Sequence, residues 1–185
     1  LAHLPGRMFD DLTFDRHGRF YLSDLSGSFA HPSAGIFYVE PDEETIHPVI
    51  EQGLIATNGI GLDPDEENLW VTEYGRQRLL HFRLGDDRYS IVSSYSNIPY
   101  YFTGLEGPDS LCVDRDGNVY VSMCGQGRFI VFNPNGFPIG QILLPGREHG
   151  DMLKSTHITI RPGTTEAYMC SSNLKTGEAE RFKAG

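Results

Sequence analysis

The sequence is poor in cysteine, in positive charge and in long apolar runs. Its three cysteines, Cys112, Cys124 and Cys170, lie far apart and form no CxxC pair, which argues against a zinc knuckle or a redox motif. Each lies in or beside an apolar run, so we expect free, buried thiols in a reducing cytosol and a cytoplasmic protein.

The chain carries 15 Lys and Arg against 25 Asp and Glu, for a net charge of −10. Nucleic-acid binding normally needs a clustered basic face, so we expect no nucleic-acid partner. No apolar run approaches the roughly 18 residues that span a membrane. Residues 1–15 lack the basic start and apolar block of a signal peptide, and we expect no membrane association.

Several catalytic signatures are also missing. There is no GxSxG elbow, which argues against a serine hydrolase. There is no Walker or dinucleotide-binding motif, since the glycines of "CGQGRF" lie between two expected strands rather than at the start of a helix.

The sequence does contain a repeat of about fifty residues. Four segments align, and they begin 48, 51 and 47 residues apart, at Asp10, Asn58, Asp109 and Thr156. The third and fifth positions of every copy are apolar, which is the period-two pattern of a strand. The sixth position is Asp15, Asp63, Asp114 or Arg161, and an aspartate there favours a turn that leads into a second strand with an aromatic residue.

Further strand-like runs follow in the first three copies. They cover residues 35–39 and 47–51, then 78–82 and 89–94, then 128–132 and 140–144. About four short antiparallel strands per unit, with no long amphipathic helix, are typical of an all-β fold, a β-propeller. The alternative, a β-sandwich, would not repeat the same pattern four times.

We therefore interpret residues 1–185 as part of a single propeller domain, with repeats that start near residues 10, 58, 109 and 156. Four units of this type are few for a closed ring, and the chain starts at Leu1 rather than at Met. We expect one or two preceding blades at the N-terminal side, and a short tail at the C-terminal side.

The first residue of each repeat predicts a polar ring at one mouth of the central channel. If the first strand is innermost, Asp10, Asn58, Asp109 and Thr156 converge there, and Ser110 adds an oxygen beside Asp109. The strand-face pattern selects Asp10 over Asp11, which falls on the face of Thr13. The alternative is that these residues only start strands, where Asp and Asn bond to local amides.

The shared position favours a bound cation. Carboxylate and amide oxygens suit Ca²⁺, whereas Zn²⁺ would require His or Cys, which this ring lacks. Four further residues could contribute to the site. His157 could line the same cavity, and the aromatic run Tyr100–Phe102 could form a wall beside the cation or pack between blades.

Several segments resemble one known family. "DDLTFDRHGRFYLSD", "ATNGIGL", the long run at residues 98–148 and "MLKSTHITIRPGT" are similar to the SMP-30/gluconolactonase/LRE-like family, and the likeness covers nearly the whole chain. It implies a six-bladed propeller that holds Ca²⁺ at the top of its channel and hydrolyses lactone rings. It also implies the metal ligands Asp10, Asn58, Asp109 and Ser110.

The resemblance makes Asp109 the catalytic acid and base as well as a ligand. Two features of the family are not matched in this chain. A further Glu ligand comes from the first blade of the family, which this chain does not contain. A second, structural Ca²⁺ uses an Asp and a Thr at positions that correspond to Ala2 and Pro5 here, so we do not expect that second site.

The resemblance thus implies a calcium-dependent lactonase, a hydrolase of carboxylic ester bonds, with Ca²⁺ polarising the carbonyl of a small lactone. One alternative is a hydrolase of sugar lactones, as in gluconolactonases. The other is a non-catalytic binding module with a structural cation, because propellers carry many functions. The physiological lactone and the oligomeric state stay open.

Overall fold

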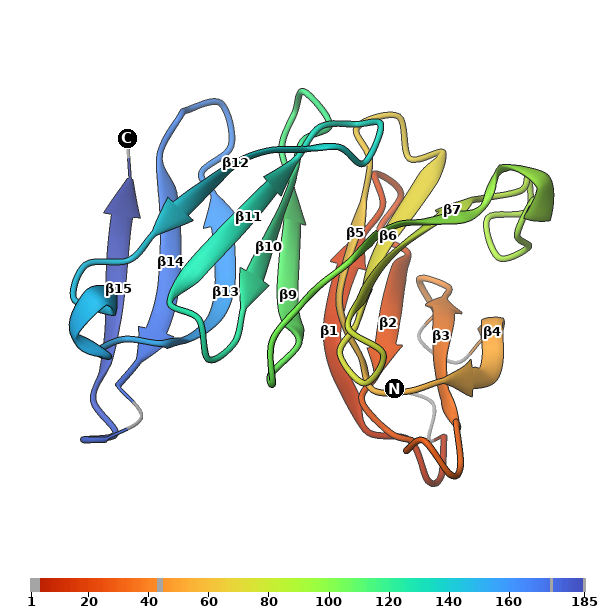
Figure 1. Ribbon diagram of the computed structural model, residues 1–185. Helices are drawn as coiled ribbons and strands as arrows, with labels where there is room; N and C mark the ends of the chain where they lie inside the picture. Colours follow the sequence, from red (N-terminus) through yellow and green to blue (C-terminus); the bar gives the residue numbers. More distant parts are fainter. Residues whose placement is uncertain (1–3, 43–44, 174, 185) are drawn as a thin grey trace.

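The chain folds into four antiparallel sheets that follow one another in sequence order, as the computed structural model in Figure 1 shows. It describes residues 4–42, 45–173 and 175–184. Within these ranges the helical structure is confined to the 3-10 turns Ser93–Tyr95 and Arg147–His149. No helix among these residues has the length and apolar character needed to cross a membrane. The all-β, propeller-type architecture confirms the sequence prediction.

Each sheet is one blade. The first contains β1 (Phe9–Phe14), β2 (Phe20–Asp24), β3 (Ala34–Val39) and β4 (Ile46–Leu54). The second contains β5 (Thr57–Leu62), β6 (Asn68–Glu73), β7 (Arg78–Arg83) and β8 (Asn97–Tyr101). The third contains β9 (Pro108–Val113), β10 (Val119–Met123), β11 (Arg128–Phe132) and β12 (Pro138–Leu143). The fourth has three described strands, β13 (Lys154–Ile160), β14 (Ala167–Ser172) and β15 (Ala179–Ala184).

The first strand of each blade lies innermost. β5 contacts both β1 and β9, and β13 contacts β9 in turn. Gly59 permits the closest of these approaches, because a Cβ there would lie 2.4 Å from the Leu111 backbone nitrogen. The four strands that begin the sequence repeats therefore line one shared channel.

Apolar side chains fill the space between neighbouring blades. Tyr21 and Ile36 of the first blade pack against Leu69 and Val71 of the second. The same arrangement recurs between the second and third blades and between the third and fourth. The aromatic residues of the second strands in the first three blades, Tyr21, Trp70 and Tyr120, belong to these layers. Tyr100 and Phe102 also pack between blades, against Phe132. These two residues of the aromatic run therefore contribute to packing between blades, the second of its two predicted roles.

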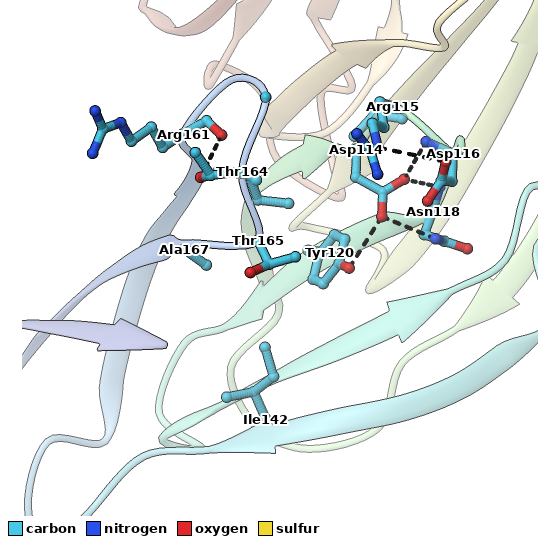
Figure 2. A pocket seen from close by; sticks show the side chains of 13 residues that line it. Asp114, Arg115, Asp116, Asn118, Tyr120, Ile142, Arg161, Thr164, Thr165 and Ala167 are labelled. Atoms are coloured by element: carbon cyan, nitrogen blue, oxygen red, sulfur yellow. Dashed lines mark hydrogen bonds and ion pairs between the residues drawn. The ribbon is translucent and has the colours of Figure 1, made fainter. Parts of the chain in front are cut away.

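The aspartates after the innermost strands form turns, as the sequence predicts. Figure 2 shows Asp114 accepting hydrogen bonds from the amides of Asp116 and Asn118, from the Asn118 side chain and from the Tyr120 hydroxyl. Asp15 and Asp63 accept equivalent bonds from the turns that follow them. The Asp114 turn borders a cleft of about 460 Å³ between the third and fourth blades, with Ile142 and Ile160 in its lining.

One predicted strand is wrong. The outermost strand of the second blade is β8, whereas residues 89–94 contribute an isolated bridge, Leu84 to Ile91, and the start of a 3-10 turn. Asp87 explains the difference, because its carboxylate accepts bonds from the amide and the hydroxyl of Ser90 and closes a local turn. The chain continues outward to Asn97 before it pairs again with β7.

The cysteines are free thiols, as predicted, but their burial differs. Cys124 is buried and Cys112 is half-buried. Cys170 is exposed, which contradicts the expectation of a buried thiol. It lies on β14, opposite His157, and borders a surface hollow with Arg181.

Candidate functional site

Every innermost strand is irregular at the position of its candidate ligand. Asp10 and Asp11 lie opposite the single residue Ser23, and Asn58 and Gly59 lie opposite Thr72. The same two-to-one pairing occurs in the third blade, where Asp109 and Ser110 face Ser122. In the fourth blade Thr156 is the additional residue. These β-bulges turn side chains away from strict alternation, which explains how polar residues reach the channel from strands with apolar faces.

Buried hydroxyl groups hold two of these bulges. The Thr72 hydroxyl accepts a hydrogen bond from the Gly59 amide at 2.7 Å and donates to the Asp109 carbonyl at 2.6 Å. It therefore links the bulge of the second blade to that of the third. In the first blade the Ser23 hydroxyl accepts from the Asp11 amide at 3.0 Å and donates to the Asp11 carbonyl at 3.3 Å.

The four predicted ligands lie in one group. Ser110 donates from its hydroxyl to Asn58 Oδ1 over 3.4 Å, and its amide donates to Asp109 Oδ1 over 3.0 Å. Asn58 and Ser110 are buried, Asp109 is half-buried and Asp10 is exposed. Burial raises the pKa of the Asp109 carboxyl to about 6, and the nearby Asp10 charge contributes to the rise. The structure thus brings the predicted residues together, while their role as ligands stays a prediction.

Asp11 lies with Thr13, as the strand-face pattern predicts. Its side chain lines a cavity of about 220 Å³ together with Thr13 and His157. Its Oδ1 accepts a bond from the Leu12 amide at 2.8 Å, but its Oδ2 is buried without a hydrogen-bond partner in the described part of the chain. Burial raises the Asp11 pKa, against the opposing effect of His157. The sequence offered two adjacent aspartates but no sign of the bulge.

The other buried carboxylates among the described residues are neutralised by arginines, in contrast to those of the channel. Asp24 pairs with Arg7 at 3.0 Å, and Glu73 pairs with Arg76 at 2.7 Å and with Arg78. Among the described residues, neither Asp10, Asp11 nor Asp109 forms an ion pair within 4.0 Å. Grouped carboxylates without a positive partner are unfavourable unless a cation or protons compensate them.

These oxygens fit a hard cation. Two carboxylates, the Asn58 amide oxygen and the Ser110 hydroxyl are the donor types that Ca²⁺ prefers. In residues 4–42, 45–173 and 175–184, no three Asp, Glu, His or Cys side chains lie close enough to hold a metal ion by themselves. A bound ion would therefore need Asn58 and Ser110, together with ligands from water, substrate or other chain segments.

The remaining predicted residues occupy other places. His157 lines the cavity that contains Asp11, whose lining includes none of the four predicted ligands, and Thr156 borders the hollow beside Cys170. Tyr101 is exposed. Of the two positions compared for a second metal, Pro5 is exposed and Ala2 lies outside the described residues.

Comparison with known proteins now identifies the family. The sequence profile of the SMP-30/gluconolactonase/LRE-like region matches residues 2–153. The chain belongs to this family. It is 50% identical to lactonase drp35 of Staphylococcus aureus (strain bovine RF122 / ET3-1) over 168 residues, which is 91% of this chain and 52% of that protein. The chain thus spans about half the length of the curated relatives it matches.

Solved structures of the same fold show lower identity. One is regucalcin of Agrobacterium tumefaciens, a calcium-binding protein, with a TM-score of 0.76 and 18% identity over 97% of this chain and 62% of that one. Another is a gluconolactonase of Xanthomonas campestris, with a TM-score of 0.73 and 19% identity over 93% of this chain and 58% of that one. At this identity the likeness establishes the propeller fold alone.

Proposed function

We propose that the channel mouth around Asp109 is the active site of a calcium-dependent lactonase. The observation that carries the proposal is the recurrent bulge, which gathers Asp10, Asn58, Asp109 and Ser110 from three successive blades. The 50% identity to lactonase drp35 over 91% of this chain supports lactone hydrolysis as the reaction. The proposed substrate is a small lactone, and the protein is proposed to act as a soluble, cytoplasmic enzyme.

The chemistry needs an electrophile and a proton carrier. A divalent cation held by these oxygens would polarise the lactone carbonyl and stabilise the negative charge that develops on its oxygen. Asp109 would accept a proton from the attacking water and deliver it to the ring oxygen as the carbon–oxygen bond breaks. Ser110 and Asn58 position the Asp109 carboxylate, through the contacts of the buried cluster.

An Asp109→Asn variant of the full-length protein tests the role of Asp109 as the acid and base. The amide keeps an oxygen that can face a cation but cannot accept a proton. We expect Ca²⁺ binding in calorimetric titration to persist, while kcat for lactone hydrolysis falls by about a hundredfold or more. The matched control is Asp114→Asn, which removes the same charge from a turn at the opposite end of the third blade's inner strand and should keep both properties. Unchanged turnover in Asp109→Asn would exclude Asp109 as the acid and base.

A substrate panel addresses the two alternatives. Aldonolactones compared with simple aromatic lactones separate a sugar-lactone hydrolase, which the gluconolactonase fold relative suggests, from a broader lactonase. Ca²⁺ binding without hydrolysis of any lactone would instead favour a non-catalytic module with a structural cation.

A further inference from the structure

The first two blades each place a pair of rings on their second and third strands. Tyr21 lies opposite Tyr38 on β2 and β3, and the two ring centroids are 5.0 Å apart. Trp70 lies opposite His81 on β6 and β7, with centroids 4.5 Å apart. Rings at such distances attract each other beyond the effect of burial alone. Tyr21 and Trp70 are 1% and 2% exposed, so the ring on the second strand is covered in both blades.

The third blade lacks this pair. Its second-strand ring is Tyr120, and the residue opposite on β11 is Val131. The next residue in the same row is Gly140 on β12, where a Cβ would meet no atom within 4 Å. Directly opposed residues on neighbouring strands share one face of a sheet, so the ring of Tyr120 has only small residues beside it in its row. Tyr120 is accordingly only half-buried.

Tyr120 lines the cleft of about 460 Å³ between the third and fourth blades. Figure 2 shows its ring in the lining together with Ile142. Val113 and Ile160 add further apolar surface, and all four residues are half-buried. The volume is in the range of small-molecule sites in proteins. Both walls belong to blades of this chain, and the cleft lies at the opposite end of β9 from the channel mouth.

The lining of the cleft also includes a positive group. Arg115, whose side chain is 79% exposed, forms no side-chain hydrogen bond in the described ranges, and its ion pair with Asp116 spans 3.8 Å. Arg161 is less suitable for a ligand, because it pairs with Glu166 at 3.3 Å and extends away from Tyr120 in Figure 2. The cleft therefore combines an aromatic wall with one guanidinium that an anion could engage.

We propose that this cleft is a second binding site and that its ligand is a small aromatic acid. The ring of the ligand packs on Tyr120, as Tyr38 and His81 pack on the second-strand rings of the first two blades. The carboxylate binds Arg115, because a guanidinium suits a carboxylate through paired, charge-assisted hydrogen bonds. The site is separate from the channel mouth, so its occupation does not depend on the lactonase function proposed above.

Three ligands with one skeleton test the ring and the charge separately. They are 2-naphthoate, its neutral carboxamide and the fully saturated decahydronaphthoate, each titrated into the full-length protein by ligand-observed NMR. We expect 2-naphthoate to bind about tenfold more tightly than the carboxamide, and about threefold or more tightly than the saturated acid. A chelator removes cations from the channel mouth during these titrations. No saturable binding of 2-naphthoate, or equal affinities for the three ligands, would overturn the proposal.

An Arg115→Gln variant locates the carboxylate. It should bind 2-naphthoate about tenfold more weakly than the unaltered protein and bind the carboxamide equally well. The matched control is Arg83→Gln, because Arg83 pairs with Glu67 at 2.6 Å on the second blade and its loss should leave both affinities intact. Unchanged 2-naphthoate affinity in Arg115→Gln would contradict the assignment, and so would an equal loss for both ligands.

Filling the cleft from within tests the place of the ring. Val131→His gives the third blade the pair that the second blade already has, so we expect affinity for 2-naphthoate to fall about tenfold or more. Val131 is 9% exposed, and a thermal melt therefore checks that the variant folds. Gly140→Phe adds a ring to the same row from the exposed outermost strand, where a Cβ has room. A folded variant of either kind that binds 2-naphthoate as tightly as the unaltered protein would refute the site. None of these titrations measures hydrolysis, so a failure here leaves the lactonase proposal intact.

Discussion

At the scale of single residues, hydrogen bonding separates two groups of aspartates. Asp15, Asp63 and Asp114 bind the amides of the turns that follow the innermost strands. Asp10 and Asp109 lie in the channel group, where loss of hydration raises the pKa of both carboxyls and the Asp11 charge adds to the rise at the more exposed Asp10. Two aspartates five positions apart, such as Asp109 and Asp114, therefore have different roles at opposite ends of the same strand.

Asp15 should make stability depend on acid. Burial alone would raise its pKa, but the Arg19 side chain, 2.6 Å away, and the amides of His17 and Arg19 hold it below the ordinary value. A lowered pKa stabilises the fold above the unfolded value of about 3.9, and this contribution disappears as the pH falls through the folded value.

The test compares the unaltered protein with Asp15→Asn in urea unfolding at a series of pH values. At neutral pH the variant should be less stable by about 1–3 kcal/mol, because a charge-assisted hydrogen bond is lost. The difference should shrink as the pH falls from about 5 to about 3. Parallel curves for the two proteins over that range would contradict the assignment.

The turn aspartates could be predicted from sequence, whereas the channel geometry could only be predicted in part. Period-two apolar positions and a following Asp identify a strand and its turn by local chemistry. The surroundings of the channel residues depend on the bulges and on a neighbouring blade, which leave no local pattern in the sequence.

At the scale of strands, the bulge connects the blades to the site. Thr72 is fully buried, and its hydroxyl satisfies the Gly59 amide and the Asp109 carbonyl at once. The position of Asp109 therefore depends on a side chain of the preceding blade. The outermost strand of the second blade could not be predicted from the sequence. Residues 89–94 have the composition of a strand, but the Asp87 turn shifts the pairing with β7 to β8.

Replacing Thr72 with Val should disturb both fold and site. Val keeps the shape but leaves an amide and a carbonyl buried without their partner, so we expect a loss of about 2 kcal/mol or more in the free energy of unfolding. Ca²⁺ affinity should fall as well, because the Asp109 backbone loses its anchor. Thr72→Ser, which keeps the hydroxyl, is the control. Denaturation and calorimetry that show Thr72→Val equal to the unaltered protein would refute this role.

At the scale of the whole molecule, the blades are equivalent in pattern but not in environment. Ile60 and Ile158 are 3% and 0% exposed between blades, whereas the corresponding Leu12 of the first blade is 47% exposed. Phe14 is 61% exposed on the same flank. Repeats and turn residues were sufficient to predict the propeller, since each unit obeys the same local rules. The expectation of preceding blades stays a prediction, as does the upstream Glu ligand.

Lactone hydrolysis by this protein should require a cation bound at the channel mouth. The most direct measurement is the initial rate of hydrolysis of an aromatic lactone by the natural-length protein, before chelation, after chelation and after return of Ca²⁺. We expect the rate to fall to background on chelation and to recover with Ca²⁺, because the clustered oxygens of Asp10, Asn58, Asp109 and Ser110 supply no electrophile of their own. A chelated protein that hydrolyses the lactone at its original rate would contradict the central claim.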